Sequence, residues 1–416
     1  MRTWTFGLWC SVLLCGACAD AVPALTFDIR ALTTAGEDPF VDADSFDRVR
    51  IRVKQQDSQV ITLEAATAGT FDLSTSFESL SAPTRVRLEL EGDNPLHGAP
   101  PVFAPGASQG VVRFAVGAPS SCERVDGFDR DSDGASFTRI DTFILGAGGQ
   151  DSSSVWIFDL LRLATTELDP LPSEGPTVST RLGASSALII NDSGAYRYDL
   201  GVDPSQDDRV AELALHQGAD HTTALLTREN GGVLAVGPGL GFSLIAPDGR
   251  VILGDDLATA RTRPGLVEIG GSPFIFGGNA DGALFEIVDV DRGETTPMGD
   301  GTLPSSAGAL NVDGTVWLIH DDDTSSVIRG CPACEMPEAG PANSGVVVGA
   351  THLITAGMLS AVPLEEALPP GQAPTLDPVA SPLTPPRAVF AYESGIVFLA
   401  DDEGAQLCFP GDLSPL

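Results

Sequence analysis

The sequence predicts an all-β protein in which a small antiparallel domain precedes a larger region of repeated sheets. Of the 416 residues, 46 are glycine and 31 are proline, which suits many short strands joined by turns better than long helices. Apolar and polar side chains alternate near the N-terminus, as they do in half-buried strands. From about residue 137 onward a glycine-rich hairpin recurs, and "GGSPFIFGGNADGALFEIVD" at 270–289 is one copy of it.

The N-terminus has the pattern of an export signal. Arg2 supplies a positive charge, a short apolar run covers residues 8–14, and the small residues of "LCGACAD" follow. The run is too short to span a bilayer in the mature chain, so residues 1–21 are predicted to be a signal peptide. Residues 14–18 resemble a bacterial lipobox, in which Cys18 becomes the acylated first residue, although Cys15 replaces the usual leucine. The alternative is cleavage after Ala19 or Ala21, which gives a free secreted protein.

Residues 22–117 predict a small β-sandwich. The stretch "DRVRIRVKQ" places Val49, Ile51 and Val53 on one face of a strand and arginines on the other, and "TRVRLELEG" repeats the pattern. Four further stretches alternate in the same way, so six or seven short strands fit into about a hundred residues. The arginine rows are a candidate anion-binding face, but Glu89 and Glu91 share the exposed side, which favours an ordinary solvated surface.

An acidic connector, residues 118–136, separates the two regions and carries a candidate calcium motif. Asp129, Asp131 and Asp133 alternate before Gly134, as carboxylates do in the first half of an EF-hand loop. The position of the bidentate glutamate holds Ile140, and no helical pattern flanks the motif. Two interpretations stay open: a linker stiffened by calcium, or a solvated acidic turn.

The repeated hairpin predicts a β-propeller over residues 137–416. The strand that follows each glycine-rich turn begins near Val155, Ala195, Phe242, Leu284, Ser326, Leu359 and Gln406. A spacing of about 40–50 residues is typical of propeller blades, which have four strands each and stack side by side into a ring. Seven blades are expected, with six as the alternative if the fifth and sixth units do not form separate blades.

Several of these units resemble kelch repeats. The paired glycines Gly148-Gly149 and Gly277-Gly278 and the third-strand aspartates match that family's pattern; the aspartates are Asp159, Asp199 and Asp289. The usual fourth-strand tryptophan is missing, and the last three units lack the double glycine. The resemblance implies that one blade takes strands from both ends of the chain.

Four cysteines remain after the signal: Cys122, Cys331, Cys334 and Cys408. An even number in an exported protein favours disulfides. Cys331 and Cys334 are close enough to pair with each other, with a redox or metal role as the alternative, and elimination then pairs Cys122 with Cys408. Together with the kelch resemblance, that second disulfide would hold the ring closed.

The remaining features narrow the function without naming a ligand. A formal net charge of −34 repels polyphosphate and argues against nucleic-acid binding. Acidic turns recur at Asp281, Asp321–Asp323 and Asp401–Asp402, and a proline-rich loop covers 363–386. The histidines (His97, His216, His221, His320 and His352) are expected to be isolated surface residues.

The sequence therefore favours an outer-membrane-anchored lipoprotein, on the periplasmic or surface face, whose propeller binds a protein or glycan. The alternatives are a secreted protein, a propeller enzyme with its site at the channel mouth, and a structural envelope component.

Overall fold

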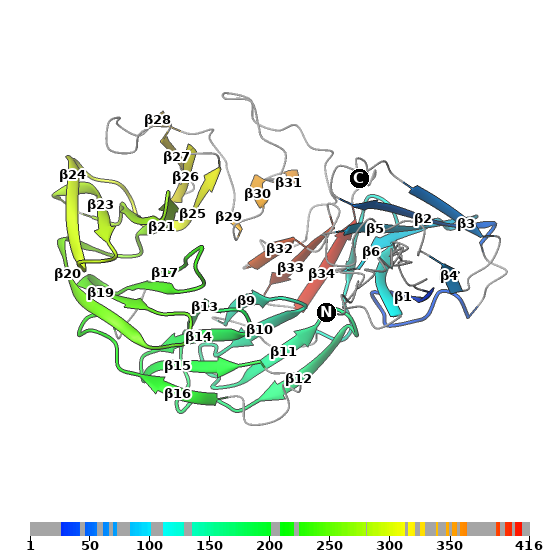
Figure 1. The fold of residues 1–416 in the computed structure, drawn as a ribbon, viewed down its shortest axis with the longest axis horizontal. Helices are drawn as coiled ribbons and strands as arrows, with labels where there is room; N and C mark the ends of the chain where they lie inside the picture. Colours follow the sequence, from blue (N-terminus) through cyan, green and yellow to red (C-terminus); the bar gives the residue numbers. More distant parts are fainter. Residues whose placement is uncertain are drawn as a thin grey trace, which may run out of the picture.

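The computed structural model describes the chain in segments: residues 26–41, 46–55, 61–65, 70–72, 84–100, 111–128, 135–200, 209–219, 224–279, 281–312, 315–320, 325–328, 338–339, 347–348, 352–355, 358–363, 388–391, 396–401 and 404–409. All regular elements in these segments are β-strands (Figure 1). No helix long and apolar enough to cross a membrane occurs among these residues.

Seven strands form the N-terminal domain. They are β1 (Thr26–Thr33), β2 (Arg48–Gln55), β3 (Ile61–Ala65), β4 (Thr70–Asp72), β5 (Thr84–Glu91), β6 (Leu96–Ala99) and β7 (Val111–Gly117). They hydrogen-bond in the order β3-β2-β5-β6-β7-β1-β4, and β1 and β7 run parallel. The predicted sandwich is thus one hydrogen-bonded sheet, not two separately bonded ones.

The inner face of this sheet carries the core that the alternating pattern predicts. Val49, Ile51 and Val53 of β2 are buried with the apolar positions of β1, β5 and β7 in a single cluster. Strands that are not adjacent in the sheet share this cluster, which requires the sheet to curl around it. Each such side chain contributes about 1.5–3 kcal/mol by leaving water.

The described residues from 121 onward form seven sheets. The first contains β9 (Ser136–Ile140), β10 (Phe143–Ala147), β11 (Val155–Asp159) and β12 (Ala164–Leu168). The second contains β13 (Val178–Leu182), β14 (Ser186–Asn191), β15 (Gly194–Asp199) and β16 (Arg209–Leu213). The third contains β17 (Ala224–Thr227), β18 (Val233–Val236), β19 (Gly239–Ile245) and β20 (Val251–Arg261). The fourth contains β21 (Gly265–Ile269), β22 (Ser272–Phe276), β23 (Ala283–Asp289) and β24 (Glu294–Asp300).

The last three sheets complete the circle. The fifth contains β25 (Ser306–Val312), β26 (Thr315–His320), β27 (Ser325–Ile328) and β28 (Glu338–Ala339). The sixth contains β29 (Val347–Val348), β30 (His352–Thr355) and β31 (Met358–Pro363). The seventh contains β32 (Ala388–Ala391), β33 (Val397–Asp401), β34 (Gly404–Phe409) and, from before the first sheet, β8 (Ser121–Arg124).

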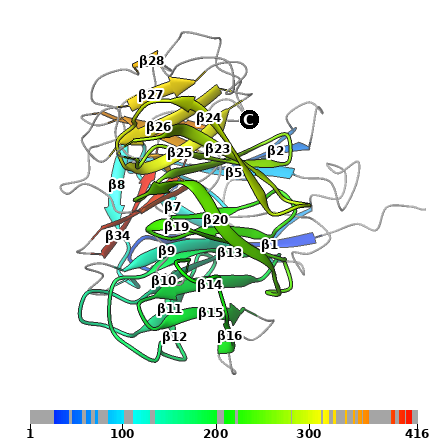
Figure 2. The same cartoon turned by 90° about the vertical axis from the view of Figure 1, so that its left-hand side faces the viewer.

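The first strand of each sheet contacts the first strands of both neighbours, and the series closes on itself. β9 touches β13, the contacts continue through β17, β21, β25, β29 and β32, and β32 touches β9. Figure 1 shows the sheets arranged around this circle, with the N-terminal domain to one side, and Figure 2 shows the molecule from the side of β20 and β24. The predicted propeller is present, and the third strands begin within three residues of the expected positions. The sixth sheet has three described strands, so the number of blades stays a prediction.

Apolar clusters between neighbouring sheets hold the ring together. Leu145 and Ile157 of the first sheet pack with Ile189 and Tyr198 of the second. Similar clusters join the second sheet to the third, the third to the fourth and the fourth to the fifth. Each of these sheets buries apolar surface only because a neighbour covers it.

The paired glycines are needed where a turn meets the next sheet. Gly148 (φ +68°) and Gly277 (φ +63°) have left-handed backbones that favour glycine. A Cβ on Gly148 would lie 2.2 Å from Thr177 Cγ2, and one on Gly277 would lie 2.8 Å from Pro304 O. Thr177 and Pro304 both precede the first strand of the following sheet, so glycine lets the turn approach that strand closely.

The third-strand aspartates cap turns or pair with arginine. Asp159 Oδ1 accepts hydrogen bonds from the backbone N–H groups of Leu161 (2.8 Å) and Arg162 (3.3 Å). Asp289 Oδ1 accepts equivalent bonds from residues 291 and 292, both at 3.1 Å. Asp199 instead pairs with Arg197 at 2.7 Å. These residues therefore stabilise the sheets, and their repetition reflects the fold rather than a ligand.

Candidate functional site

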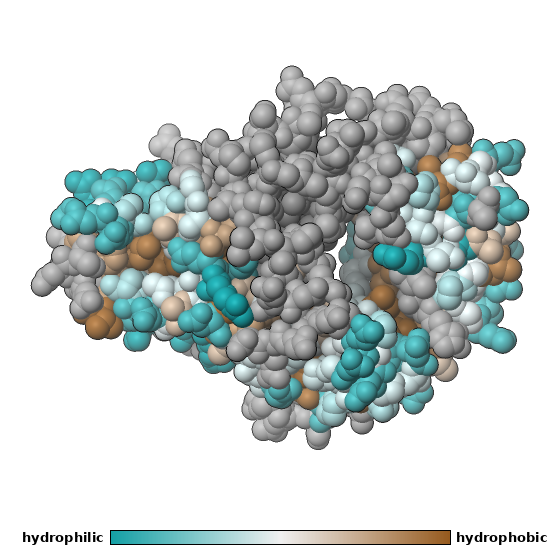
Figure 3. Space-filling model, turned by 180° about the vertical axis from the view of Figure 1, so that it is seen from behind, coloured by the Kyte–Doolittle hydropathy of each residue, from teal (hydrophilic) through white to brown (hydrophobic). Residues whose placement is uncertain are grey.

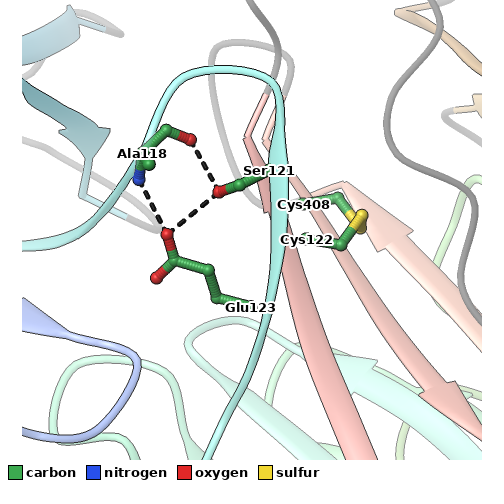
Figure 4. Close-up of a disulfide and its surroundings, with 5 residues drawn as sticks. All are labelled: Ala118, Ser121, Cys122, Glu123 and Cys408. Atoms are coloured by element: carbon green, nitrogen blue, oxygen red, sulfur yellow. Dashed lines mark hydrogen bonds between the residues drawn. A yellow bond between two sulfur atoms is a disulfide. The ribbon is translucent and has the colours of Figure 1, made fainter.

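A disulfide joins the two ends of the ring (Figure 4). Cys122 of β8 lies directly opposite Cys408 of β34 in the antiparallel register, and their sulfurs are bonded across a sequence separation of 286 residues. The predicted pairing of these two cysteines is present. Residues 121–124 were expected in the connector, but they form the outer strand of the last sheet. Closure is therefore both covalent and hydrogen-bonded.

Glu123, next to the disulfide, ties β8 to the N-terminal domain. Its Oε1 accepts hydrogen bonds from Ala118 N at 2.8 Å and Ser121 Oγ at 2.9 Å (Figure 4). Its Oε2 accepts a hydrogen bond from Thr34 Oγ1 at 3.0 Å, and Thr34 follows β1 directly. One carboxylate thus fixes both the turn that enters the ring and the end of the first strand of the chain.

An aromatic cluster fills the closure of the ring. The Phe128 ring is fully buried, and its centroid lies 4.8 Å from Trp156, 5.3 Å from Phe158 and 5.5 Å from Phe398. The same cluster includes Ala99 and Ala115 of the N-terminal domain, and Leu32 packs against it. The two domains therefore share a core at this junction, which favours a fixed relative orientation.

The acidic connector leaves this cluster at Phe128 and returns at β9. Asp129, Asp131 and Asp133 lie outside the described residues, but both flanks are fixed. Thr165 Oγ1 donates a 2.6 Å hydrogen bond to Gly127 O, and Ser136 Oγ lies 2.8 Å from Thr177 Oγ1. Thr165 is level with the end of β9 and Ser136 begins it, so the connector begins near the side of the ring where the first strands end and returns to the side from which they start.

Acidic turns lie at the side of the ring from which the first strands start. Strands alternate in direction within each sheet, so the turns between second and third strands share one end with the connections that enter first strands. Asp151, Asp192 and Asp281 occupy such turns and are exposed; we call these three residues the acidic rim. Asp321–Asp323 and Asp402 lie outside the described residues, and Asp401 ends β33.

The opposite side of the ring carries arginines at the ends of successive first strands. Arg139 Nε donates to Asp141 O at 3.1 Å, and Arg181 Nε donates to Gly183 O at 2.9 Å in the same way. Arg228 instead forms a 3.0 Å ion pair with Glu268 of the next sheet. The sequence signal for this group is a Thr-Arg pair that recurs at 138, 180 and 227, with the spacing of the blades.

Hydroxyl groups bridge these first strands within the ring. Thr138 Oγ1 lies 2.9 Å from Ser179 Oγ, and Thr180 Oγ1 lies 2.7 Å from Thr227 Oγ1. Figure 3 shows the ring from behind, with a hollow near its middle and hydrophilic residues over much of its described surface. The described first strands thus offer hydroxyl and guanidinium groups near the axis.

A buried ion pair links the third and fourth sheets. Arg261 of β20 and Glu286 of β23 are fully buried, with Nη2 and Oε1 3.3 Å apart. Arg261 also donates to Gly277 O at 2.8 Å, and Glu286 accepts from the backbone of Ala258 at 2.7 Å. Burial lowers the pKa of Arg261, and the charge of Glu286 opposes that effect. Because both side chains are sealed from solvent, this pair has a structural role.

The three histidines whose side chains the structure describes, His97, His216 and His320, do not form a metal site. His97 and His320 are buried, so the expectation of surface residues is wrong for these two, because sheet neighbours cover both. His320 Nε2 lies 2.8 Å from Ser326 Oγ, and His216 Nε2 lies 3.2 Å from Asp256 Oδ1. Among the described residues no group of three or more His, Cys, Asp or Glu side chains could hold a metal ion. Cys18, Cys331 and Cys334 fall outside the described segments.

Comparison with known proteins gives structural likenesses only. No family model matches the chain, and no curated protein matches it. Streptogramin B lyase is similar at a TM-score of 0.49 and 11% identity, over 69% of this chain and 96% of its own. The computationally designed Ika8 protein is similar at a TM-score of 0.44 and 11% identity, over 68% of this chain and 97% of its own. BamB from Moraxella catarrhalis is similar at a TM-score of 0.42 and 12% identity, over 77% of this chain and 93% of its own. Likenesses this distant do not extend to function.

Proposed function

We propose that this chain is an exported, lipid-anchored binding protein whose kelch-like propeller is presented at the cell envelope. The disulfide between Cys122 and Cys408 carries the proposal, because such bonds persist in oxidising compartments. The signal-like N-terminus supports the same location, and Cys18 is the proposed site of acylation.

The acidic rim is the proposed binding surface. Asp151, Asp192 and Asp281 are exposed on turns, and the sheets that carry these turns pack against their neighbours. Turns on a rigid scaffold suit recognition, because the scaffold fixes their relative positions. Their shared negative charge suits a protein or glycan that presents cationic groups.

Calcium is the proposed ion of the connector. Asp129, Asp131 and Asp133 would supply its carboxylates, and hydrogen bonds at Gly127 and Ser136 fix the two flanks of that motif. A cation there would stiffen the entry into the first sheet.

A pull-down with the full chain tests the binding proposal. We expect envelope extracts to yield a molecule that the wild type retains and that the variant Asp151→Asn/Asp192→Asn/Asp281→Asn loses. The variant Arg162→Gln/Arg292→Gln, at the opposite side of the ring, serves as the matched control and retains the molecule. If the wild type and both variants retain the same molecules in the same amounts, the acidic rim is not the binding surface.

Metabolic labelling with a fatty acid tests the anchor separately. We expect label on the wild type and none on the Cys18→Ser variant. An unlabelled wild type, or equal label on both, would rule out acylation of Cys18.

A further inference from the structure

The disulfide that closes the ring skips two cysteines of the sequence. Cys122 is bonded to Cys408, and Cys331 and Cys334 lie between them in the chain. These two cysteines are outside the described segments, but their order along the chain is given by the sequence. Cys122 can therefore bond to three downstream cysteines during folding, and only the last of them is its native partner.

Loop closure favours the wrong partners. The native bond closes a loop across 286 residues, whereas Cys331 and Cys334 lie 209 and 212 positions after Cys122. Closure becomes less probable with the three-halves power of loop length, so each wrong bond is favoured about 1.6-fold over the native one. Of the first bonds that Cys122 makes to a downstream cysteine, about a quarter are then native.

The native site of the disulfide excludes a wrong bond. Cys122 in β8 lies directly opposite Cys408 in β34, and the Cys408 side chain is buried. A Cys331 or Cys334 sulfur bonded to Cys122 would have to lie where the Cys408 sulfur lies. The two strands could then not pair in their native register. A wrong bond therefore keeps the ring open, and it must be broken before β34 can pair with β8.

An open ring leaves aromatic surface uncovered. The cluster around Phe128 takes Trp156 and Phe158 from the first sheet and Phe398 and Phe409 from the last. Without closure these side chains lose the contacts that bury them. Apolar surface exposed in this way promotes aggregation unless a folding helper covers it. A partner that corrects the bond therefore needs both a reactive thiol and a surface for apolar side chains.

We propose that this chain is a substrate of a thiol–disulfide isomerase in the compartment to which it is exported. This inference rests on the proposed export, because disulfides form and persist in oxidising compartments. The partner is a protein with a reactive dithiol, which exchanges disulfides through a mixed-disulfide intermediate. Uncatalysed rearrangement takes minutes to hours, so the partner sets the rate at which the ring closes.

The exchange is balanced without net oxidation. A disulfide oxidant first removes two electrons and two protons for each bond and is reduced to thiols. We consider a chain with wrong bonds between Cys122 and Cys331 and between Cys334 and Cys408. An isomerase thiolate attacks the Cys331 sulfur and releases the Cys122 thiolate, which attacks the Cys408 sulfur and forms the native bond. The Cys334 thiolate released in that step attacks the Cys331 sulfur and frees the isomerase. Two disulfides are present before and after.

Oxidative refolding of the full chain tests the proposal. The purified wild type is reduced, unfolded and refolded in a glutathione redox buffer, with and without protein disulfide isomerase. Free thiols are alkylated at intervals, and peptide mapping without reduction identifies the bonds. Without the isomerase, we expect about a quarter of the first downstream bonds of Cys122 to be native, with a further rise over minutes to hours. With the isomerase, the native bond should reach its final level at least about tenfold sooner.

The variant Cys331→Ser/Cys334→Ser removes both wrong partners and serves as the control. It should form the bond between Cys122 and Cys408 at the same rate with and without the isomerase, and its unfolding temperature establishes that it folds. The wild-type rates and bond maps decide the question even if this variant does not fold. Equal wild-type rates in the two conditions, or a folded variant that depends on the isomerase as strongly as the wild type, would overturn the proposal.

The refolding assay requires neither export nor acylation, so its failure is distinct from failure of the proposed function. Export is scored in a bacterial host by removal of the signal and by labelling of Cys18. In the same host without its periplasmic isomerase, we expect less closed ring from the wild type and an unchanged amount from the variant Cys331→Ser/Cys334→Ser. An equal yield of closed wild-type ring in both hosts would contradict the role of the isomerase.

Discussion

Removing the ring-closing disulfide should lower stability by a calculable amount. We consider the variant Cys122→Ala/Cys408→Ala, which avoids placing a hydroxyl at the buried Cys408 position. For a sequence separation of 286 residues, the chain-entropy relation gives about 5.6 kcal/mol at 25 °C. Losses measured for native disulfides are smaller, about 2–5 kcal/mol. We therefore expect a loss of about 3–5 kcal/mol.

Contacts other than the disulfide should still close the ring in this variant. The pairing of β8 with β34 and the cluster around Phe128 persist without the sulfur bond, so the ring should still form. For a folded unit of this size, about 2 °C corresponds to 1 kcal/mol, so calorimetry should show unfolding about 6–10 °C lower.

A reducing agent provides the control for this prediction. It should lower the unfolding temperature of the wild type by about the same amount and have a much smaller effect on the variant, whose remaining cysteines include Cys331 and Cys334. If the variant and the oxidised wild type unfold at the same temperature, the disulfide does not contribute to closure and the reasoning fails.

Three further changes test other parts of the structure. Gly278→Ala should lower the free energy of unfolding by at least about 2 kcal/mol more than Gly271→Ala. Both glycines have positive φ, but only a Cβ at Gly278 would meet backbone, at 2.3 Å. Equal losses for the two variants in chemical denaturation would show that this contact is unimportant. Glu286→Gln should cost about 3–5 kcal/mol by leaving Arg261 buried without its counter-ion, and unchanged stability would contradict that. Calcium should raise the unfolding temperature of the wild type but not of Asp131→Asn, and a shift in both would place the ion elsewhere.

Much of the ring could be predicted from the sequence, because its repetition has a simple physical cause. The first and fourth sheets need the same turn at the same place, so glycine occurs at equivalent positions, Gly148 and Gly277. The third-strand aspartates recur for an equally local reason, since Asp159 and Asp289 cap the turns that follow them. Local requirements of this kind leave regular traces in a sequence.

Pairs of residues from different strands were harder to predict, because register between strands decides them. Alternation alone shows that Arg30 and Arg113 leave the core, but only the parallel pairing of β1 with β7 places them side by side. The same holds for Arg261 and Glu286, which belong to different sheets. The pairing of Cys122 with Cys408 could be predicted by elimination, because few cysteines are present. Residue types that occur many times in the chain do not allow such an elimination.

The position of β8 has a consequence for biosynthesis. A ribosome completes residues 121–124 long before residues 404–409, yet these two segments must pair for the circle to exist. During synthesis the early strand therefore keeps an unpaired edge until almost the entire polypeptide has emerged. A nascent chain that stops before Gly404 lacks the strand that pairs with this edge. A premature stop codon near the 3′ end of the gene would therefore be as damaging as one in its middle.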